Sequence, residues 1–379
     1  MESAEPLPGG AVKAPDLADL LDRAGSFVSV YLHTDPDVEN ARQLAEKRWK
    51  ALRGELREME APDAALERIH EETGDAHTRG RVLGVVTDGG GAFHVEHGDP
   101  FQPQDFGRVG AVTYVLPMIR WRQASPPVIV VLIDRTGANL YSIARGAEEA
   151  REVSGVDWPV HKASAGGWSM RRYQERVENT WERKAENVAE TLQAMARRFD
   201  PRTVVAAGDV RAVALLRESM PADLQSLVVE IAGDRPRGEK GDPIPEEVND
   251  VVADVVRVET EALLERFRQE IGQGDLAAQG ISDVVGALAR AQVETLLIDD
   301  DLEDESMLWV GEKAPQIGRS AEELGALGID DPKKVRSRDA VVHAALTTDA
   351  GIRVLENGSQ IDGGVGALLR WRNGEASAP

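Results

Sequence analysis

The residues best suited to carry chemistry form one polar stretch, His161–Tyr173, with the sequence HKASAGGWSMRRY. Its adjacent glycines, Gly166 and Gly167, allow backbone conformations closed to other residues and let a loop approach another surface closely. The stretch runs directly into a pattern typical of a long helix, and the free amides at a helix N-terminus favour a phosphate group. This combination predicts contact with phosphate or RNA. The alternative is a flexible surface loop that precedes an ordinary helix.

The same stretch is basic within an acidic chain. From residue 161 to residue 176 it holds four basic residues against one acid, a local net charge of +3. The whole chain of 379 residues has 44 Lys and Arg against 66 Asp and Glu, which gives a net charge of −22 with His neutral. Bulk positive charge therefore cannot hold this protein on nucleic acid, and any RNA contact must be local.

A long helix and a hairpin are the elements that must position this stretch. Ser169–Phe199 contains no Pro or Gly, and its apolar residues recur at spacings of three and four, which predicts one amphipathic helix. Asp200 precedes a proline, which excludes it from helical geometry and ends the helix. Upstream, the apolar run Val128–Ile133, a turn over Asp134–Gly137 and the run Ala138–Ile143 predict a β-hairpin, in which the first Asp is a turn residue.

Apolar runs and helical patterns divide the chain into three predicted domains, 1–125, 126–273 and 274–379, each large enough for its own core. The first contains the apolar strands Phe27–Tyr31 and Val82–Thr87 with a charged helix between them, and the third alternates helices with strands. Such alternation is typical of layered α/β domains. We therefore expect α/β and α+β domains with mixed sheets flanked by helices.

Residues that the chain lacks exclude several kinds of site. It has no Cys, and its seven His are scattered without ligand spacing. It has no Walker loop, dinucleotide fingerprint or nucleophile elbow. We expect no metal and no cofactor. The longest apolar run, Val128–Ile133, has six residues, far fewer than the ~20 of a membrane span. We expect a cytoplasmic, soluble protein with no membrane partner and no DNA partner.

A second basic group stands in the third predicted domain. Lys333, Lys334, Arg336 and Arg338 lie within six positions and form a candidate secondary contact for rRNA or for a protein. A solvated surface is the alternative, because runs of charge are usually exposed to water.

In its setting, the stretch 161–173 resembles the middle domain of the archaeo-eukaryotic class I release factor and Pelota superfamily. In that family a basic loop with a lysine carries Gly-Gly-Gln-Ser and leads into the basic, aromatic start of a long helix. The resemblance implies that the matching residues here bind ribosomal RNA. They are Lys162, Gly166, Gly167, Trp168, Ser169, Arg171, Arg172 and Tyr173. The upstream hairpin, VIVVLIDRTGANLYSI, is similar to the hairpin that opens the same domain.

Two later segments extend the resemblance. Gly280–Ile298 resembles the family's helix-to-strand segment, and Gly363–Arg372 resembles its closing Gly-rich strand. The N-terminal match is weaker and is limited to Phe27–Tyr31 and the helix that follows. Matches in this order over nearly the whole chain imply a three-domain, release-factor-like architecture.

Two departures separate the chain from the release factors. Where the family uses glutamine to position the water that cleaves the peptidyl-tRNA ester, this sequence has Trp168, whose indole donates one hydrogen bond and offers no useful acceptor. The Asn-Ile-Lys-Ser loop and the Tyr-x-Cys-x-x-x-Phe motif with which the family reads stop codons are both absent. We therefore expect neither decoding nor peptidyl-tRNA hydrolysis, and no enzymatic activity.

The resemblance then implies a factor that occupies the A site of the 70S ribosome without decoding or cleaving. This describes the bacterial release-factor-like branch of the superfamily, which includes the hibernation factor Balon. It makes the ribosome a partner and elongation factor Tu a candidate partner. Two alternatives stay open. One is a rescue hydrolase, with the loop backbone or a neighbour such as Ser169 or Gln174 orienting the water, or a Pelota-like recycling factor. The other is a non-ribosomal protein-interaction module, which the acidic composition favours.

Overall fold

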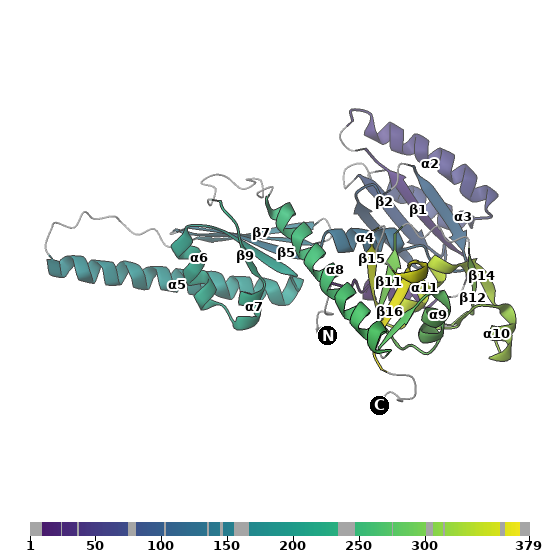
Figure 1. Cartoon of the computed structure of the whole chain (residues 1–379). Coiled ribbons are helices and arrows are strands. Elements are labelled where there is room, and N and C mark those ends of the chain that lie inside the picture. The colour runs from purple at the N-terminus through teal and green to yellow at the C-terminus, as the bar shows by residue number, and fades with distance from the viewer. Residues whose placement is uncertain are drawn as a thin grey trace. The chain divides into compact units, whose positions relative to one another are not determined.

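The computed structural model describes residues 10–23, 25–35, 38–74, 81–101, 104–134, 136–144, 147–154, 167–233, 247–274, 276–300, 306–313, 315–356 and 361–371. The chain folds into two compact units (Figure 1). The first unit combines the N-terminal part, up to Gln123, with the C-terminal part, from Val258 onward, and the second unit spans Ala124–Arg257.

The N-terminal part of the first unit is built on an antiparallel sheet with the strand order β3-β2-β1-β4. Strand β1 shows how the sheet separates two layers, because side chains alternate along a strand. Val28, Val30 and Leu32 pack beneath α2 and α3, whereas Phe27 and Tyr31 face the core that contains α4. The elements are η1 (Pro15–Leu17), α1 (Ala18–Leu21), β1 (Phe27–His33), α2 (Ala41–Glu58), α3 (Asp63–Thr73), β2 (Val82–Thr87), β3 (Phe93–Gly98), β4 (Phe106–Gly110) and α4 (Leu116–Ala124).

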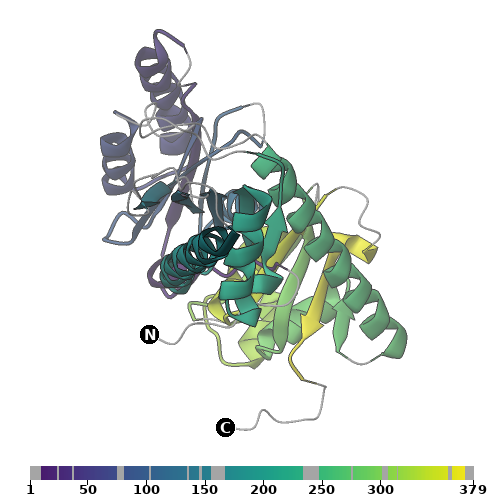
Figure 2. The same cartoon turned by 90° about the vertical axis from the view of Figure 1, so that its left-hand side faces the viewer.

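The C-terminal part contains the sheet β10-β16-β11-β15, in which β11 and β15 run parallel. Helices α9 and α11 cover one face of this sheet, and the second half of α8 lies on the other (Figure 2). Leu263 and Phe267 of α8 are buried against that face. A small antiparallel sheet, β13-β12-β14, stands beside them. The elements are α8 (Glu247–Gln273), β10 (Ala277–Gln279), α9 (Ile281–Ala289), β11 (Val293–Asp299), β12 (Met307–Val310), β13 (Ile317–Gly318), α10 (Ala321–Ala326), β14 (Lys333–Arg336), α11 (Ser337–Thr347), β15 (Gly351–Leu355), η3 (Asp362–Gly364) and β16 (Val365–Leu369).

The N-terminal and C-terminal parts share one hydrophobic core, in which Met118 and Ile119 of α4 belong to the same cluster as Val341 of α11. The N-terminal segment also extends the C-terminal sheet beyond β15. The backbone N–H of Val12 donates to the carbonyl of Ile352 at 2.8 Å, and the reverse hydrogen bond measures 2.9 Å. These contacts make two ends of the chain a single unit.

Polar groups reinforce the same joint. The side-chain amide of Gln123 bonds both backbone groups of Val354, at 2.7 Å and 2.9 Å, as a neighbouring strand would. The guanidinium of Arg108 donates to both carboxylate oxygens of Asp339, at 3.0 Å and 2.8 Å. Burial raises the pKa of Asp339 in spite of this cation. Arg353 is 1% exposed and donates to the carbonyl of Gly10 at 2.8 Å.

The second unit is a five-stranded mixed sheet with the order β7-β6-β5-β8-β9. Strand β5 runs antiparallel to β6 and parallel to β8. Ile129 and Val131 of β5 face α5 and α6, whereas Val128 and Val130 face Val248 at the start of α8. The further elements are β5 (Val128–Ile133), β6 (Gly137–Ala144), β7 (Ala147–Ser154), α5 (Gly167–Phe199), β8 (Thr203–Gly208), α6 (Val210–Ser219), α7 (Ala222–Ser226) and β9 (Val228–Glu230).

The expected fold class is confirmed, since mixed sheets flanked by helices make up both units. The strands expected at Val82–Thr87 and Val128–Ile133 have these same bounds. Each of the three segments 1–125, 126–273 and 274–379 contributes at least one sheet, while the first and third share a core. The division into three domains at these boundaries remains a proposal. Among the described helices, none combines the length and apolar character that a bilayer span requires.

The half-buried side chain of His343, on α11, predicts a pH-dependent stability. Its Nδ1 atom has no solvent contact and no hydrogen-bond partner within the described residues. Burial lowers the pKa of His343 to about 4, although Asp22 acts in the opposite direction. The unfolded chain takes up this proton near pH 6.5. The free energy of unfolding should therefore fall as the pH drops from about 6.5 to about 4, by about 3 kcal/mol from this group.

His343→Gln should remove this contribution and flatten the curve in that window. The measurement is urea unfolding, followed by tryptophan fluorescence, at several pH values between 4 and 7 for both proteins. The difference between the two curves isolates His343 from the carboxylates that titrate in the same range. Parallel curves for the two proteins would contradict the prediction.

Candidate functional site

The residues that the sequence singles out stand at the start of helix α5. Lys162 and Gly166 lie outside the described residues. The others form the first two turns of α5, for which the structure describes the backbone; they are Gly167, Trp168, Ser169, Arg171, Arg172 and Tyr173. The helix begins at Gly167, two residues earlier than expected, so Trp168 belongs to the first helical turn and not to the loop before it.

The second half of α5 anchors the helix to its sheet. Ala185, Val188, Leu192 and Met195 are buried in the core against β5, β6 and β8. Gly167 precedes the first of these by 18 positions, about 27 Å along a helix that rises about 1.5 Å per residue. The first part of α5 runs well beyond the sheet of its own unit (Figure 1). The helix therefore holds the Gly-Trp-Ser segment far from the core that fixes it.

The electrostatics of this helix start favour an anion. The first turn of α5 contains no acidic residue, so its own sequence places no carboxylate against the partial positive charge of a helix N-terminus. Arg171 and Arg172 follow in the second turn and add full positive charge. A phosphate is the natural ligand for this combination of free amides and cations.

The hairpin turn beside the packed part of α5 uses its carboxylate locally. Asp134 Oδ1 accepts hydrogen bonds from the backbone N–H of Thr136 at 2.7 Å, the hydroxyl of Thr136 at 2.6 Å and the backbone N–H of Gly137 at 3.0 Å. Asp134 is therefore a turn residue, as expected. A small open hollow lies beside it, between α5 and α6. Apolar groups such as Val188 and Leu215 line it together with Asp134 and Lys184.

The second basic group lies in the first unit, on β14 and at the start of α11. Lys333, Lys334 and Arg336 are exposed along the strand, whereas Arg338 is half-buried. Because side chains alternate along a strand, Lys334 and Arg336 share one face. Lys333 points the other way and pairs with Asp331. The structure thus offers Lys334 and Arg336 together as an exposed basic pair.

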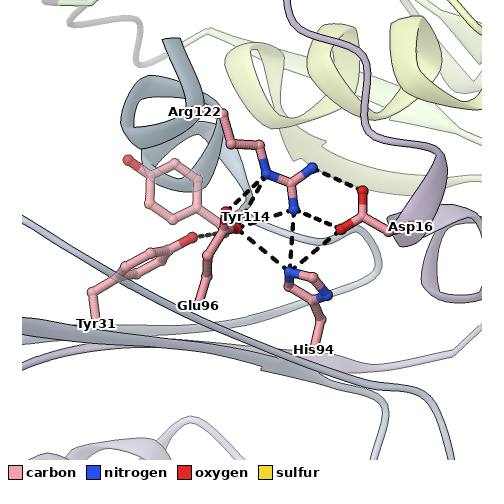
Figure 3. Close-up of polar contacts among 6 residues, drawn as sticks. All are labelled: Asp16, Tyr31, His94, Glu96, Tyr114 and Arg122. Atoms are coloured by element: carbon pink, nitrogen blue, oxygen red, sulfur yellow. Dashed lines mark hydrogen bonds and ion pairs between the residues drawn. The ribbon is translucent and has the colours of Figure 1, made fainter. Parts of the chain in front are cut away.

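Sequence reasoning missed one cluster of titratable side chains in the N-terminal part (Figure 3). Arg122 of α4 donates to both oxygens of Asp16, at 2.9 Å and 2.8 Å, and to Glu96 of β3 at 2.9 Å. The imidazole of His94 lies 3.4 Å from Glu96. Burial would raise the pKa of Glu96, but hydrogen bonds from His94 and Arg122 outweigh it and leave the pKa below its usual value.

The neighbouring tyrosines of this cluster serve the fold as well. Tyr31 donates from its hydroxyl to the backbone carbonyl of Tyr114 at 2.8 Å, and burial raises its pKa well above the usual value. Arg122 is 6% exposed and has both carboxylates as partners. A catalytic set needs groups that face a substrate, whereas these groups satisfy one another. The cluster ties the N-terminal segment to α4 and β3. No group of three or more potential ligands in the described part of the chain could hold a metal ion.

Comparison with known proteins gives matches in both the middle segment and the whole chain. Residues 127–273 match the family model for bacterial archaeo-eukaryotic release factor family 2. An uncharacterized protein of Mycobacterium tuberculosis is 28% identical over 365 residues, covering 93% of this chain and 95% of its own. Peptide chain release factor subunit 1 of Archaeoglobus fulgidus is 27% identical over 147 residues, 34% of this chain and 35% of its own.

Two solved structures span nearly the whole chain. The archaeal translation termination factor aRF1 covers 96% of this chain and 100% of its own, with 16% identity and a TM-score of 0.25. Archaeal Pelota, in a model of its ribosome-bound form with ABCE1, covers 98% and 99%, with 14% identity and a TM-score of 0.40.

The cluster around Arg122 yields a stability prediction. Arg122→Met leaves the carboxylates of Asp16 and Glu96 partly buried without their cation, which should lower the free energy of unfolding by about 3–5 kcal/mol. Arg217→Met is the matched control, because Arg217 and Glu230 are 50% and 49% exposed and such a pair contributes at most about 1 kcal/mol. Urea unfolding followed by circular dichroism measures both. A small and equal loss in the two variants would show that the cluster does not anchor the segment.

Proposed function

Since its middle segment makes the chain a member of the release-factor and Pelota-like superfamily, we propose that it is a ribosome-binding factor. It occupies the A site of the 70S ribosome and reads no stop codon. It leaves the peptidyl-tRNA ester intact. Its setting is an idle ribosome during hibernation or stress.

The observation that carries this proposal is the position of Trp168 in the first turn of α5. The helix start is basic, free of acids and held about 27 Å from the packed half of the helix, which suits a probe that reaches into an RNA-lined site. A hydrolytic factor needs a small group there that both accepts from and donates to a water molecule. Indole cannot do both. It can stack on a base, a contact that contributes about 1–3 kcal/mol.

Protein partners enter the proposal through the C-terminal part. Residues 274–379 contain 10 Lys and Arg against 19 Asp and Glu, a net charge of −9. Such a surface is repelled by phosphate except at local basic groups such as Lys334 and Arg336. We infer that this part faces protein, and elongation factor Tu is the candidate for that partner.

One alternative has an observation in its favour. The net charge of −22 suits a protein-interaction module that works away from the ribosome, because like charge keeps such a protein off RNA. Binding to ribosomes separates the two functions, since contact through phosphate weakens steeply as salt is added.

Charge removal at the helix start tests the ribosome contact. Lys162→Gln, Arg171→Gln and Arg172→Gln together should weaken co-sedimentation with 70S ribosomes and lower its salt dependence, by roughly 0.7–0.9 in the logarithmic slope for each lost phosphate contact. The matched control makes the same charge change on exposed arginines of the same helix, Arg183→Gln, Arg197→Gln and Arg198→Gln.

The control triple should bind as the wild type does. If both triples bind equally well and with equal salt slopes, the start of α5 is not the electrostatic anchor. If the wild type fails to bind ribosomes at any salt concentration, the non-ribosomal alternative replaces the proposal.

A release assay tests the chemistry. The wild-type protein, added to ribosomes that carry labelled peptidyl-tRNA, should release peptide at the rate seen without any factor, because Trp168 cannot orient the attacking water. Release at stoichiometric level or above, lost on changing Gly166 and Gly167 but kept in Trp168→Ala, would promote the rescue hydrolase instead. Restoration of release in Trp168→Gln would place the helix start at the reacting ester.

A further inference from the structure

Helix α2, in the N-terminal part, leaves one face open. Its inner face packs on the sheet through Ala45, Trp49, Leu52 and Leu56, all at most 4% exposed. Helix α3 lies along one flank. No described element of the same unit covers the opposite side, where α2 forms the outer boundary (Figure 1).

The open face of α2 carries a row of basic residues, with the exposed Glu55 and Glu58 beside it, although the protein is acidic. Gln43, Lys47, Lys50, Gly54 and Arg57 recur every three or four positions, share one side of the helix and are all exposed. We call these five residues the α2 basic face. The helix as a whole holds six Lys and Arg against three Glu, a net charge of +3. The face runs over fourteen positions, from Gln43 to Arg57, about 21 Å along the axis.

Two lysines of this face have their charge unopposed. The described structure records no ion pair for either Lys47 or Lys50, on α2 itself or from α3. Other basic side chains of the helix are paired: Arg42 with Glu46, Arg53 with Glu67, and Arg57 with Asp63 at 4.0 Å.

The outermost of these pairs can open at little cost. Arg42 and Glu46 are 64% and 52% exposed, and Arg57 and Asp63 are 56% and 87% exposed. Exposed pairs of this kind contribute at most about 1 kcal/mol. Arg42 and Arg57 can therefore leave their carboxylate partners for an anion that binds them more tightly. They add to the positive charge that the two lysines already present.

We propose that the α2 basic face binds the phosphate backbone of an RNA segment. The assignment to RNA rests on charge complementarity. A row of cations on an uncovered helix face matches the row of negative charges along a phosphate backbone. Gly54 has nothing near the position of a side chain, so a backbone can approach closely there. The proposal rests on the proposed ribosome binding and adds a second RNA contact, remote in sequence from the start of α5.

A membrane surface does not fit the same helix. An amphipathic helix holds a bilayer by inserting its apolar face, and the apolar face of α2 is spent on the protein core. What remains exposed is polar and basic, which suits the surface of RNA and offers nothing to the interior of a lipid layer.

The test compares the full chain with the Lys47→Gln, Lys50→Gln double variant, in co-sedimentation with 70S ribosomes and in fluorescence anisotropy with a short RNA duplex. The double variant should bind both probes about tenfold or more weakly at 0.1 M salt, and the logarithmic salt slope should fall by roughly 1.4–1.8. Lys47→Arg with Lys50→Arg should restore binding. Glu55→Gln with Glu58→Gln removes two exposed charges from the same helix and should cause no loss.

The outcomes separate the inference from the proposed function. Wild-type binding to ribosomes with no change in the double variant overturns the inference and leaves the proposed function intact. Binding to the duplex that depends on the two lysines, with no binding to ribosomes, supports the inference and overturns the proposed function. Displacement of the duplex by poly-glutamate as readily as by RNA, at equal charge, would assign the face to an acidic protein and overturn the RNA assignment.

Discussion

Burial of Val188, Leu192 and Met195 between α5 and its sheet is the contact on which the geometry of the middle unit depends. It fixes the last fifteen residues of a 33-residue helix. Because a helix is straight, the axis of this packed segment also sets the direction of the preceding turns. A helix propagates easily from a formed segment when no Gly or Pro interrupts it. The sheet is thus the anchor of the unit, and the candidate binding segment lies on an extension of the helix that packs on it.

Local patterns predicted much of the fold, because each of them depends only on residues that are close together in the sequence. Continuous apolar runs gave β2 and β5, and apolar spacing gave α5 to within two residues. Strands β3 and β4 were missed, since every residue of both is only half-buried and neither shows a clear alternation. Such patterns also could not predict that the N-terminal and C-terminal parts of the chain join in one unit. Pairing of Val12 with Ile352 depends on where the intervening chain places them.

The two kinds of site differ in the same way. The basic, Gly-bearing start of α5 is contiguous and therefore readable in the sequence. The cluster around Arg122 is assembled from residues as far as 106 positions apart, and none of its members stands out alone. The α2 basic face is local and periodic, but its meaning depends on which side of the helix the core occupies. Burial of Trp49 and Leu56 answers that question only once the sheet is in place.

The edge pairing of Val12 with Ile352 also sets an order of events during synthesis. These residues are 340 positions apart, and at about 5–20 residues per second the ribosome needs roughly 17–70 s to make the second after the first. The middle unit is complete at Arg257. It therefore has time to fold before the C-terminal part of the first unit has been synthesised and can join the N-terminal part. Until then Leu17, Met118 and Ile119, all buried in the finished protein, lack their partners from the C-terminal part. The nascent chain must carry this apolar surface through most of its own translation.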